Sequence, residues 1–367
     1  MKKIVYTIST LRRSGPVLVL YGIIKNLDRS TFEPIIITLS PEVKDSMQKD
    51  FQKLGIEIIS LKLSRFNGLL IGGFKFQKIV KKINPSLIHA NGFRDMILVS
   101  TFADKYKKIV SLHCDFFEDY CFKYGKVIGK IMVSLQKYAI RKINYNICVS
   151  KMLAEILSKR MPKLKFEYIN NGVDIEIFSP IKNKNNVRNK LSLPLDKKIF
   201  IWCGSFIYRK DPLTLIHAIK ELKLDDCFFV FCGARGALLE FCKEKLKNKT
   251  NVLFTGYVDN IEEYLKASDY YISTALSEGL PNAVLEAMSC GLPVILSNIP
   301  QHKYILKTIN EAGIVFDTNV KDSLISKINQ IINIEYEYYS KNAIDGIKNY
   351  FSADKMSNGY QKYYLEG

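Results

Sequence analysis

The sequence predicts an α/β protein made of two doubly wound parallel-sheet domains. Three observations support this prediction. Short runs rich in β-branched residues alternate with helix-length segments along the 367 residues. Many of these runs are continuously apolar, as expected for strands buried on both faces of a parallel sheet. The runs are too numerous for one compact sheet, and a polar, turn-rich stretch at 170–186 separates them into two sets.

Each expected element rests on this alternation. The apolar runs predict strands at 3–9, 34–39, 86–90, 108–113, 145–150, 166–170, 198–204, 227–233, 251–256, 270–274, 293–297 and 313–316. The segments between them predict helices that include 16–28, 72–84, 151–160, 212–223, 236–248 and 320–333. A further short helix is expected over 282–290, because Pro281 and Asn282 favour a helix start and Gly291 followed by Pro293 favours a stop.

The polar junction predicts the domain limits. We expect a first domain at 1–178, a second at 179–347, and a final helix at 348–367 that packs back on the first domain. Doubly wound sheets bind ligands beyond the carboxyl ends of their strands. With two such domains we therefore expect the ligand to bind in a cleft between them.

Charge and composition narrow the classes of function. The net charge of +18 and the pI of about 9.3 favour anionic partners. A nucleic-acid-binding protein is disfavoured, because no helix-turn-helix, zinc pattern or aromatic RNA-binding signature is evident. The eight cysteines form no C-x-x-C pair, which predicts reduced thiols in a cytoplasmic protein. No apolar run approaches the ~20 residues that span a bilayer, and the first 15 residues are better explained as a buried strand than as a signal peptide.

The stretch SEGLPNAVLEAMSCGLPVI (277–295) carries two glutamates. Glu278 lies in the loop before the expected helix, whose unpaired N–H groups favour an anion such as phosphate. Glu286 stands among apolar residues, where an ionised carboxylate needs a partner. The hydroxyl groups of a ribose would provide one, and so would a lysine from elsewhere in the chain.

A second stretch, GSFIYRKDP (204–212), joins an expected strand to an expected helix. Arg209 and Lys210 therefore lie at the ligand edge of the second domain. Two cations at this position can neutralise a diphosphate, although a solvated basic loop would show the same residues. Their occurrence at the same sheet edge as the two glutamates favours a nucleotide site.

With these motifs the chain resembles the family 4 retaining glycosyltransferases of the GT-B fold over nearly its whole length. The family pattern Glu-Gly-x-Pro-x-x-x-x-Glu is matched by Glu278, Gly279, Pro281 and Glu286. Further segments similar to the family are VSLHCD (110–115), CVSKMLAEIL (148–157), INNGVDIEIFSP (169–180), TGYVDNIEEYLKASDYYISTALSEG (255–279) and SNIPQHKYIL (297–306).

The resemblance implies a role for each matching residue. Glu286 would bind the ribose hydroxyls of a nucleotide sugar, and Glu278 would contact the transferred sugar. Lys210, with Arg209, would stabilise the departing nucleoside diphosphate, and His113 would be an active-site histidine. The donor would also be contacted by Gly15, Gly204, Ser205, Val258, Gly279, Leu280, Pro281 and Asn282.

The chain departs from the family pattern in two places. Ser205 stands where the family often has an arginine, so Arg209 would supply that charge. The first loop has Ser14-Gly15-Pro16 in place of a double glycine. The chain has no Asp-x-Asp motif, so we expect neither a metal nor another cofactor. Without a well-placed second carboxylate as nucleophile, front-face attack with a diphosphate oxygen as base is favoured over a covalent intermediate.

The expected acceptor side is the first domain. Segment 105–142 interleaves lysines with aromatic residues, which suits an anionic membrane surface, although a solvated basic helix over core aromatics fits equally well. A polyprenyl-diphosphate-linked glycan would explain the charge and a peripheral location at the inner face of the cytoplasmic membrane. The resemblance implies capsule, O-antigen or exopolysaccharide synthesis with a hexose or N-acetylhexosamine donor.

Two alternatives remain open from the sequence. A GT-B-fold sugar-nucleotide epimerase would need acid and base carboxylates and no acceptor. A basic protein that binds nucleic acid or a membrane surface without catalysis would share only the charge. The sequence does not fix the sugar, the linkage, the acceptor, the choice between UDP and GDP, or the oligomeric state.

Overall fold

The structure is a computed structural model that describes residues 1–63, 72–222, 225–320 and 322–366. The chain divides into two compact units: unit 1 comprises Met1–Gly172 and Ala353–Gly367, and unit 2 comprises Val173–Ser352. The expected domain limits, at 178 and 347, lie a few residues from these boundaries. Residues 223 and 321, which belong to two of the expected helices, lie outside the described residues.

Unit 1 contains a seven-stranded sheet in which every described pair is parallel. Across the sheet the strands are β3 (Glu57–Ser60), β2 (Phe32–Thr38), β1 (Lys2–Ile8), β4 (Leu87–Ala90), β5 (Lys107–Leu112), β6 (Tyr145–Cys148) and β7 (Glu167–Tyr168). Each strand of this unit except β3 was expected. β3 has only four residues, EIIS, and none of them is fully buried, so its apolar signal is weak.

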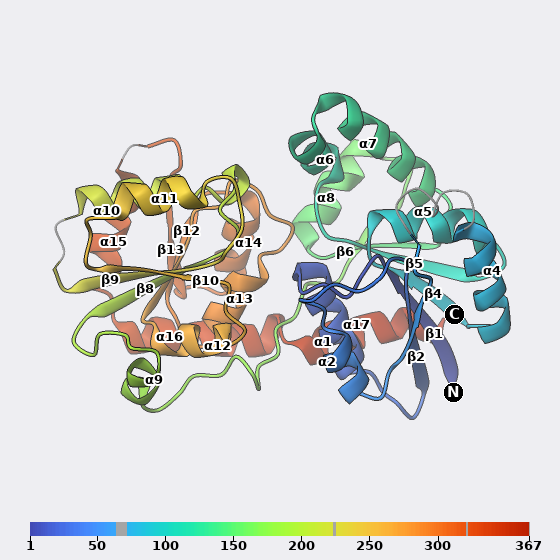
Figure 1. Ribbon diagram of the computed structural model, residues 1–367, viewed down its shortest axis with the longest axis horizontal. Helices are drawn as coiled ribbons and strands as arrows, with labels where there is room; N and C mark the ends of the chain where they lie inside the picture. Colours follow the sequence, from blue (N-terminus) through green and yellow to red (C-terminus); the bar gives the residue numbers. More distant parts are fainter. Residues whose placement is uncertain (64–71, 223–224, 321, 367) are drawn as a thin grey trace. The chain divides into compact units, whose positions relative to one another are not determined.

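Helices of unit 1 pack in two groups. Among the described residues, α1 packs on α17, whereas α4 contacts α5, α5 contacts α7, and α7 contacts α6 (Figure 1). The helices of this unit are α1 (Gly15–Lys25), α2 (Gln48–Lys53), α4 (Gly72–Ile83), α5 (Phe93–Phe102), α6 (Phe116–Tyr124), α7 (Lys126–Ile140), α8 (Lys151–Arg160) and α17 (Ala353–Leu365). α17 inserts Met356, Tyr360 and Tyr364 into the same apolar core as β1 and α1. The last helix thus completes the unit that the first strand begins.

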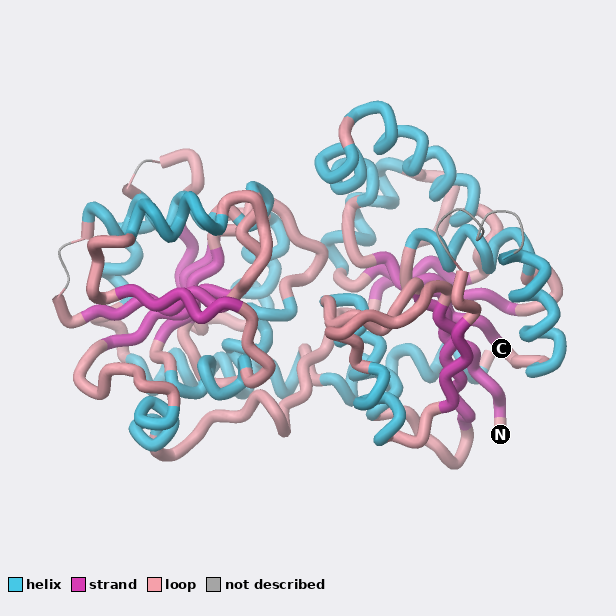
Figure 2. Tube along the Cα trace, viewed as in Figure 1, coloured by secondary structure: helices cyan, strands magenta, loops and turns pink. Residues whose placement is uncertain are grey.

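Unit 2 contains a six-stranded sheet, also parallel at every described pair. Its strands are, in spatial order, β10 (Val252–Gly256), β9 (Cys227–Cys232), β8 (Lys198–Cys203), β11 (Tyr270–Ser273), β12 (Val294–Ser297) and β13 (Gly313–Phe316). Figure 2 shows the strands of each unit as a magenta layer among cyan helices. The doubly wound parallel architecture predicted for both halves is confirmed.

The helices of unit 2 cover both faces of its sheet. α10, α11 and α15 share one layer, and α9, α12, α13 and α16 form the other (Figure 1). Stacked rings such as Phe200, Phe229 and Tyr270 fill the core between sheet and helices. The bounds are α9 (Lys184–Lys190), α10 (Pro212–Glu221), α11 (Leu239–Leu246), α12 (Ile261–Ala267), α13 (Asn282–Ser289), α14 (Pro300–Thr308), α15 (Ser323–Ile331) and α16 (Tyr336–Tyr350).

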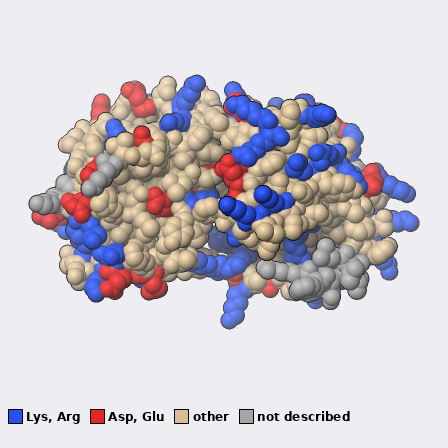
Figure 3. Space-filling view, turned by 90° about the horizontal axis from the view of Figure 1, so that it is seen from above, with Lys and Arg blue, Asp and Glu red and all other residues tan. Residues whose placement is uncertain are grey.

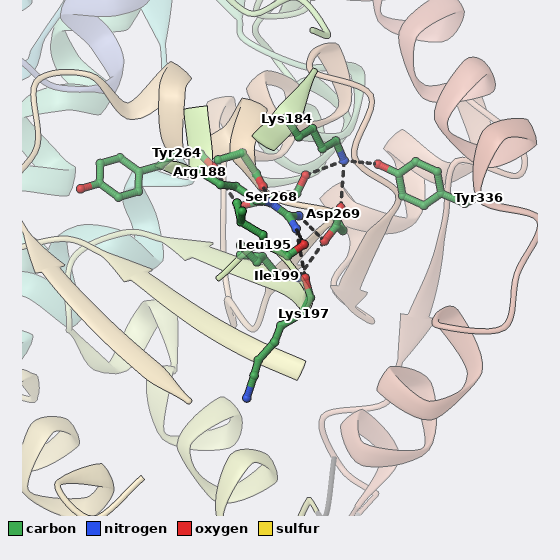
Figure 4. Close-up of polar contacts among 10 residues, drawn as sticks. Lys184, Arg188, Leu195, Lys197, Ile199, Tyr264, Ser268, Asp269 and Tyr336 are labelled. Carbon is green, nitrogen blue, oxygen red and sulfur yellow. Dashed lines mark hydrogen bonds and ion pairs between the residues drawn. The ribbon is translucent and has the colours of Figure 1, made fainter. Parts of the chain in front are cut away.

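A largely buried network of hydrogen bonds and ion pairs joins α9 to Asp269, the residue before β11 (Figure 4). Asp269 accepts from Arg188 at 2.6 Å, from Lys184 at 3.0 Å and from the Ile199 N–H at 2.8 Å. Lys184 also reaches the hydroxyl of Tyr336 at 2.9 Å. Because Arg188 is almost fully buried, its charge requires these partners. The network lies at the strand end opposite the carboxyl edge, so it is structural.

Both sheets reverse strand order at one point. In unit 1 the reversal falls between β1 and β4, and in unit 2 between β8 and β11. Chain connections leave in opposite directions from such a pair, which opens a crevice beyond its carboxyl ends. The loops after β8 and β11 are those that carry the two motifs of the second half of the chain.

Candidate active site

The loop after β8 presents two cations at the carboxyl edge of unit 2. β8 is buried until Trp202, and the chain then turns through Gly204 into a single 3₁₀ turn, Tyr208–Lys210. Asp211 follows in the left-handed region at φ 43° and caps α10, accepting from the N–H and hydroxyl of Thr214. This cap fixes the direction in which Arg209 and Lys210 leave the loop.

Gly204 packs closely in this turn. Its N–H donates to the carbonyl of Cys232 at 3.0 Å. A Cβ at this position would lie 3.2 Å from the Trp202 ring and 3.7 Å from Cδ of Lys210. The stem of Lys210 therefore crosses directly over the glycine, while Ser205 beside it is exposed.

Glu278, in the loop after β11, binds both cations. One of its oxygens accepts from Arg209 at 3.0 Å and the other from Nζ of Lys210. Arg209 also donates to the carbonyl of Ser277 at 2.6 Å. Burial would raise the pKa of Glu278, but Lys210 and Arg209 outweigh it and hold that pKa below its usual value. The carboxylate is thus ionised, and the three side chains together carry one net positive charge.

His302 is buried beside this cluster. Its ring contacts the hydroxyls of Ser273, at 3.3 Å, and Ser297, at 2.9 Å, which lie at the ends of β11 and β12. Burial lowers the pKa of His302 to about 4, although the charge of Glu278 acts in the opposite direction. The imidazole is therefore neutral near pH 7. The sequence alone assigned no role to this histidine.

Glu286 lies in α13, and most of the residues next to it on this helix are buried. Burial raises the pKa of the Cys203 thiol and of the Tyr271 hydroxyl, and the carboxylate of Glu286 adds to both increases. Its charge therefore acts on Cys203, at the carboxyl end of β8, and on Tyr271 of β11. The segment Gly279–Asn282 joins Glu278 directly to the start of this helix, with Gly279, Leu280 and Pro281 buried.

The predicted donor residues of the second half thus gather on one unit. Arg209, Lys210 and Glu278 are in direct contact. Val258 is half-buried in the loop between β10 and α12, at the same carboxyl edge of the sheet. Among the described residues, no group of three or more His, Cys, Asp or Glu side chains is placed to hold a metal ion.

The two remaining predicted residues belong to unit 1. Gly15 is the exposed first residue of α1. His113 follows β5 and lines a pocket of about 840 Å³. Burial lowers the pKa of His113 to about 4, and its Nε2 has no hydrogen-bond partner among the described residues. The pocket therefore holds a neutral imidazole with a nitrogen free to bind a polar group.

The sequence did not predict that Asn91 would line this pocket. Asn91, which follows β4, is buried and lines the pocket, and its Oδ1 has no partner among the described residues. Asp95 beneath it accepts from the N–H groups of Asn91 and Gly92, and burial raises its pKa to about 6. The signal available in the sequence was the polar pair Asn91-Gly92 directly after an apolar strand.

His89, at the end of β4, proves to be structural. It is fully buried, with Nδ1 at 2.8 Å from the hydroxyl of Tyr364 and Nε2 at 2.7 Å from that of Ser111. Both ring nitrogens are used within the core. Its place near the carboxyl end of β4 therefore does not make this histidine available to a ligand.

Comparisons with known proteins agree with the fold and the motifs. Residues 183–346 match the family described as Glycosyl transferases group 1, and residues 13–177 match Glycosyltransferase Family 4. The chain is 29% identical over 308 residues to an Escherichia coli UDP-Gal:alpha-D-GlcNAc-diphosphoundecaprenol alpha-1,3-galactosyltransferase, covering 79% of this chain and 77% of that protein. It is 27% identical to the capsular polysaccharide biosynthesis glycosyltransferase CapH of Staphylococcus aureus, over 83% of this chain and 84% of CapH.

A solved structure shares the fold over the full length. HepE of Anabaena, crystallised in complex with UDP-glucose, superimposes with a TM-score of 0.83 at 16% identity and covers 100% of both chains. The two family matches divide the chain at the same place as its two parallel sheets, and between them they leave few residues unmatched. The chain therefore belongs to the family 4 (group 1) glycosyltransferases of the GT-B fold.

Proposed function

We propose that this glycosyltransferase moves a hexose or N-acetylhexosamine from a nucleotide sugar, a UDP-sugar in the first instance, to a polyprenyl-diphosphate-linked glycan. The product would be a capsule, O-antigen or exopolysaccharide chain. The proposed donor site is supported mainly by the contact of Glu278 with Arg209 and Lys210, beyond the point where the strand order of unit 2 reverses. The relatives support the acceptor side, because one of them is named for a diphosphoundecaprenol substrate and others for capsule or O-antigen synthesis.

In this proposal Lys210 and Arg209 stabilise the diphosphate as it departs. The three side chains of the cluster retain one net positive charge, and the helix dipole of α13, which begins at Asn282 shortly after Glu278, adds partial positive charge at its amino-terminal end. These groups are fixed before the reaction, so they stabilise developing charge without reorganising. They would replace a metal ion, and we propose that the reaction needs none. Glu286 would bind the ribose hydroxyls, and Val258 would lie near the base.

We further propose retention by front-face attack. Both carboxylate oxygens of Glu278 are occupied by cations, which lowers the nucleophilicity of this side chain. A covalent glycosyl intermediate on Glu278 is therefore disfavoured. The leaving diphosphate oxygen would accept the proton of the acceptor hydroxyl. In unit 1, His113 and Asn91 would contribute polar groups to the sugar side of the reaction.

An epimerase of the same fold is less consistent with these observations, because several of the relatives are named as transferases. None of the described helices is long and apolar enough to cross a membrane. We propose a peripheral position at the inner face of the cytoplasmic membrane, where a lipid-linked acceptor is available.

The experiment that tests the proposal is release of nucleoside diphosphate from a panel of UDP-, GDP- and ADP-sugars. Each donor is assayed with EDTA present, with and without a polyprenyl-diphosphate-linked N-acetylglucosamine acceptor. Acceptor-dependent release from one UDP-sugar is the expected result. A strict requirement for a divalent metal would contradict the leaving-group model, and failure to bind any nucleotide would contradict the donor site.

A further inference from the structure

The hairpin formed by α6 and α7 in unit 1 carries more exposed apolar surface than a solvated helix pair requires. Its side chains Phe122, Tyr124, Val127, Ile128, Ile131, Leu135 and Tyr138 are all at least 43% exposed. Scattered exposed apolar residues are ordinary, but a contiguous set on one element marks an interaction site.

The exposed residues of α7 form a continuous stripe. At about 100° per residue, Val127, Ile131, Leu135 and Tyr138 fall within a sector of about 80°. The face that α7 buries lies elsewhere on the helix and contains Gly129, Gln136, Ala139 and Ile140. The stripe is therefore not part of the core of unit 1, and in a lone protein it would face water.

Positive charge borders the stripe. The hairpin and its last turn contain six cations, Lys123, Lys126, Lys130, Lys137, Arg141 and Lys142, against two carboxylates, Glu118 and Asp119. On the helix, Lys126, Lys130 and Lys137 occupy the sector beside the stripe. Figure 3 shows Lys and Arg side chains gathered over this part of unit 1 with uncharged surface between them. Apolar side chains edged by lysines match an anionic lipid surface, which offers phosphates above an apolar layer.

The other side of the stripe leads into the His113 pocket. Ile128, Met132 and Gln136, one turn apart on α7, line this pocket together with Lys123 and Tyr124 of α6. Arg12 and Arg94 line it as well. A molecule with a lipid tail in a membrane against the stripe would thus have its polar head at a cationic pocket.

The two helices of the hairpin pack tightly against each other. A Cβ on Gly129 would lie 2.5 Å from Cα of Cys121, so only glycine lets α7 cross α6 at this distance. The hydroxyl of Tyr120 donates to Gln136 across the same crossing. The exposed side chains are therefore presented on a packed element.

We propose that the stripe Val127, Ile131, Leu135 and Tyr138 seats unit 1 in the interfacial layer of an anionic membrane, with the His113 pocket open to the head of a lipid-linked acceptor. This inference rests on the proposed function for the identity of the acceptor, but membrane binding can be measured without it.

The test is co-sedimentation of the purified full chain with vesicles. One preparation is phosphatidylcholine alone and the other is an equal mixture of phosphatidylcholine and phosphatidylglycerol. The variant Val127→Glu/Ile131→Glu/Leu135→Glu alters exposed positions that do not line the pocket. Phe241→Glu, at a half-exposed aromatic residue of α11 in unit 2, is the matched control. Each protein is first checked for folding by circular dichroism.

We expect the wild type and Phe241→Glu to bind the anionic vesicles, and the triple variant to bind about tenfold less or worse. Wild-type protein that stays in solution would overturn the proposal, as would equal binding by the triple variant. Dimerisation through the stripe without vesicle binding would assign the surface to a second copy and would also overturn it.

A second readout separates this proposal from the proposed function. Nucleoside diphosphate release is measured with a short-chain acceptor that stays in solution. Turnover by the triple variant near the wild-type rate, together with lost vesicle binding, supports both proposals. Vesicle binding by a wild type that turns over no donor would leave the membrane surface standing and reject the transferase proposal.

Discussion

At the scale of single residues, the contact of Glu278 with Arg209 and Lys210 links two loops that lie far apart in the sequence. Lys210 is about one-fifth exposed, and its stem lies over Gly204. We expect Lys210→Ala to lower kcat/KM by about 10²–10³, because it removes a positioned cation from the leaving group. Steady-state kinetics with the preferred donor measure this, and Lys220→Ala, at an exposed lysine of α10, is the control. Near-wild-type turnover would remove Lys210 from the leaving-group role.

Glu286 is expected to act on donor binding. A carboxylate that accepts from ribose hydroxyls contributes about 1.5–3 kcal/mol, so Glu286→Ala should weaken nucleotide affinity about 10- to 100-fold. Titration calorimetry with the nucleoside diphosphate measures this affinity directly. Glu240→Ala changes an exposed glutamate of α11 and should have no effect. Equal affinities for all three proteins would contradict the assignment.

The sequence predicted which charged residues of unit 2 would form a donor site, but it did not predict how they pair with one another. Glu278, Lys210 and Arg209 were recognisable because each stands in a loop at a predicted strand end. Their mutual ion pairs join residues 68 and 69 positions apart, and a linear pattern contains no signal for such contacts. His302 was ambiguous for the same reason, because its environment depends on Ser273 and Ser297 from two neighbouring strands.

At the scale of elements, α17 is the clearest case of a distant segment that stabilises a core. Tyr360 is buried, and its hydroxyl lies 2.7 Å from that of Ser111 on β5. We expect Tyr360→Ala to lower the free energy of unfolding of unit 1 by about 3–5 kcal/mol, whereas Tyr360→Phe should cost about 1 kcal/mol. Urea unfolding read by circular dichroism follows both units. Trp202, the single tryptophan, lies in unit 2 and reports that unit by fluorescence. A shift of the fluorescence transition by Tyr360→Ala would contradict a local effect.

The Asp269 network gives the matching prediction for unit 2. Asp269→Asn removes the carboxylate that holds the buried Arg188 and the nearby Lys184. Loss of one partner from a buried ion pair destabilises by about 3–5 kcal/mol. The Trp202 fluorescence transition should therefore move to lower urea. An unchanged midpoint would mean that water replaces the carboxylate at Arg188.

Most elements followed from the alternation of apolar runs and helix-length segments. The expected strands were found because parallel strands buried on both faces are continuously apolar, as CFFVFC in β9 is. β3 was missed because an edge strand of four partly exposed residues lacks that signal. The last helix was expected to pack back on the first domain, but nothing in its own sequence specifies that it contacts α1 or which core its tyrosines enter.

At the scale of the whole molecule, buried histidines make stability depend on pH. Burial lowers the pKa of His89 to about 3, and of His113 and His302 to about 4. The unfolded chain therefore binds protons below about pH 6.5 that the folded chain does not bind. Stability should fall as the pH decreases from 6.5 to 4. Asp95, whose pKa burial raises to about 6, opposes part of this loss, because the folded state takes up its proton first.

Thermal unfolding at a series of pH values checks this prediction. The Tm read by Trp202 fluorescence should decrease from pH 6.5 to pH 4.5. His302→Asn removes one of the titrating groups of unit 2, so its Tm should depend less steeply on pH than that of the wild type. Parallel curves for the two proteins would show that His302 takes up its proton in the folded state.

The discontinuity of unit 1 has a consequence for the order of events on the ribosome. β1 is synthesised before unit 2, yet the core it belongs to lacks Met356, Tyr360 and Tyr364 until all of unit 2 has been synthesised. At ordinary rates of translation that interval is roughly 10–35 s. Unit 2 can therefore reach its native state while the apolar surface that α17 covers is still exposed on the nascent chain. Chaperones that act during synthesis would meet unit 1 with this apolar surface uncovered.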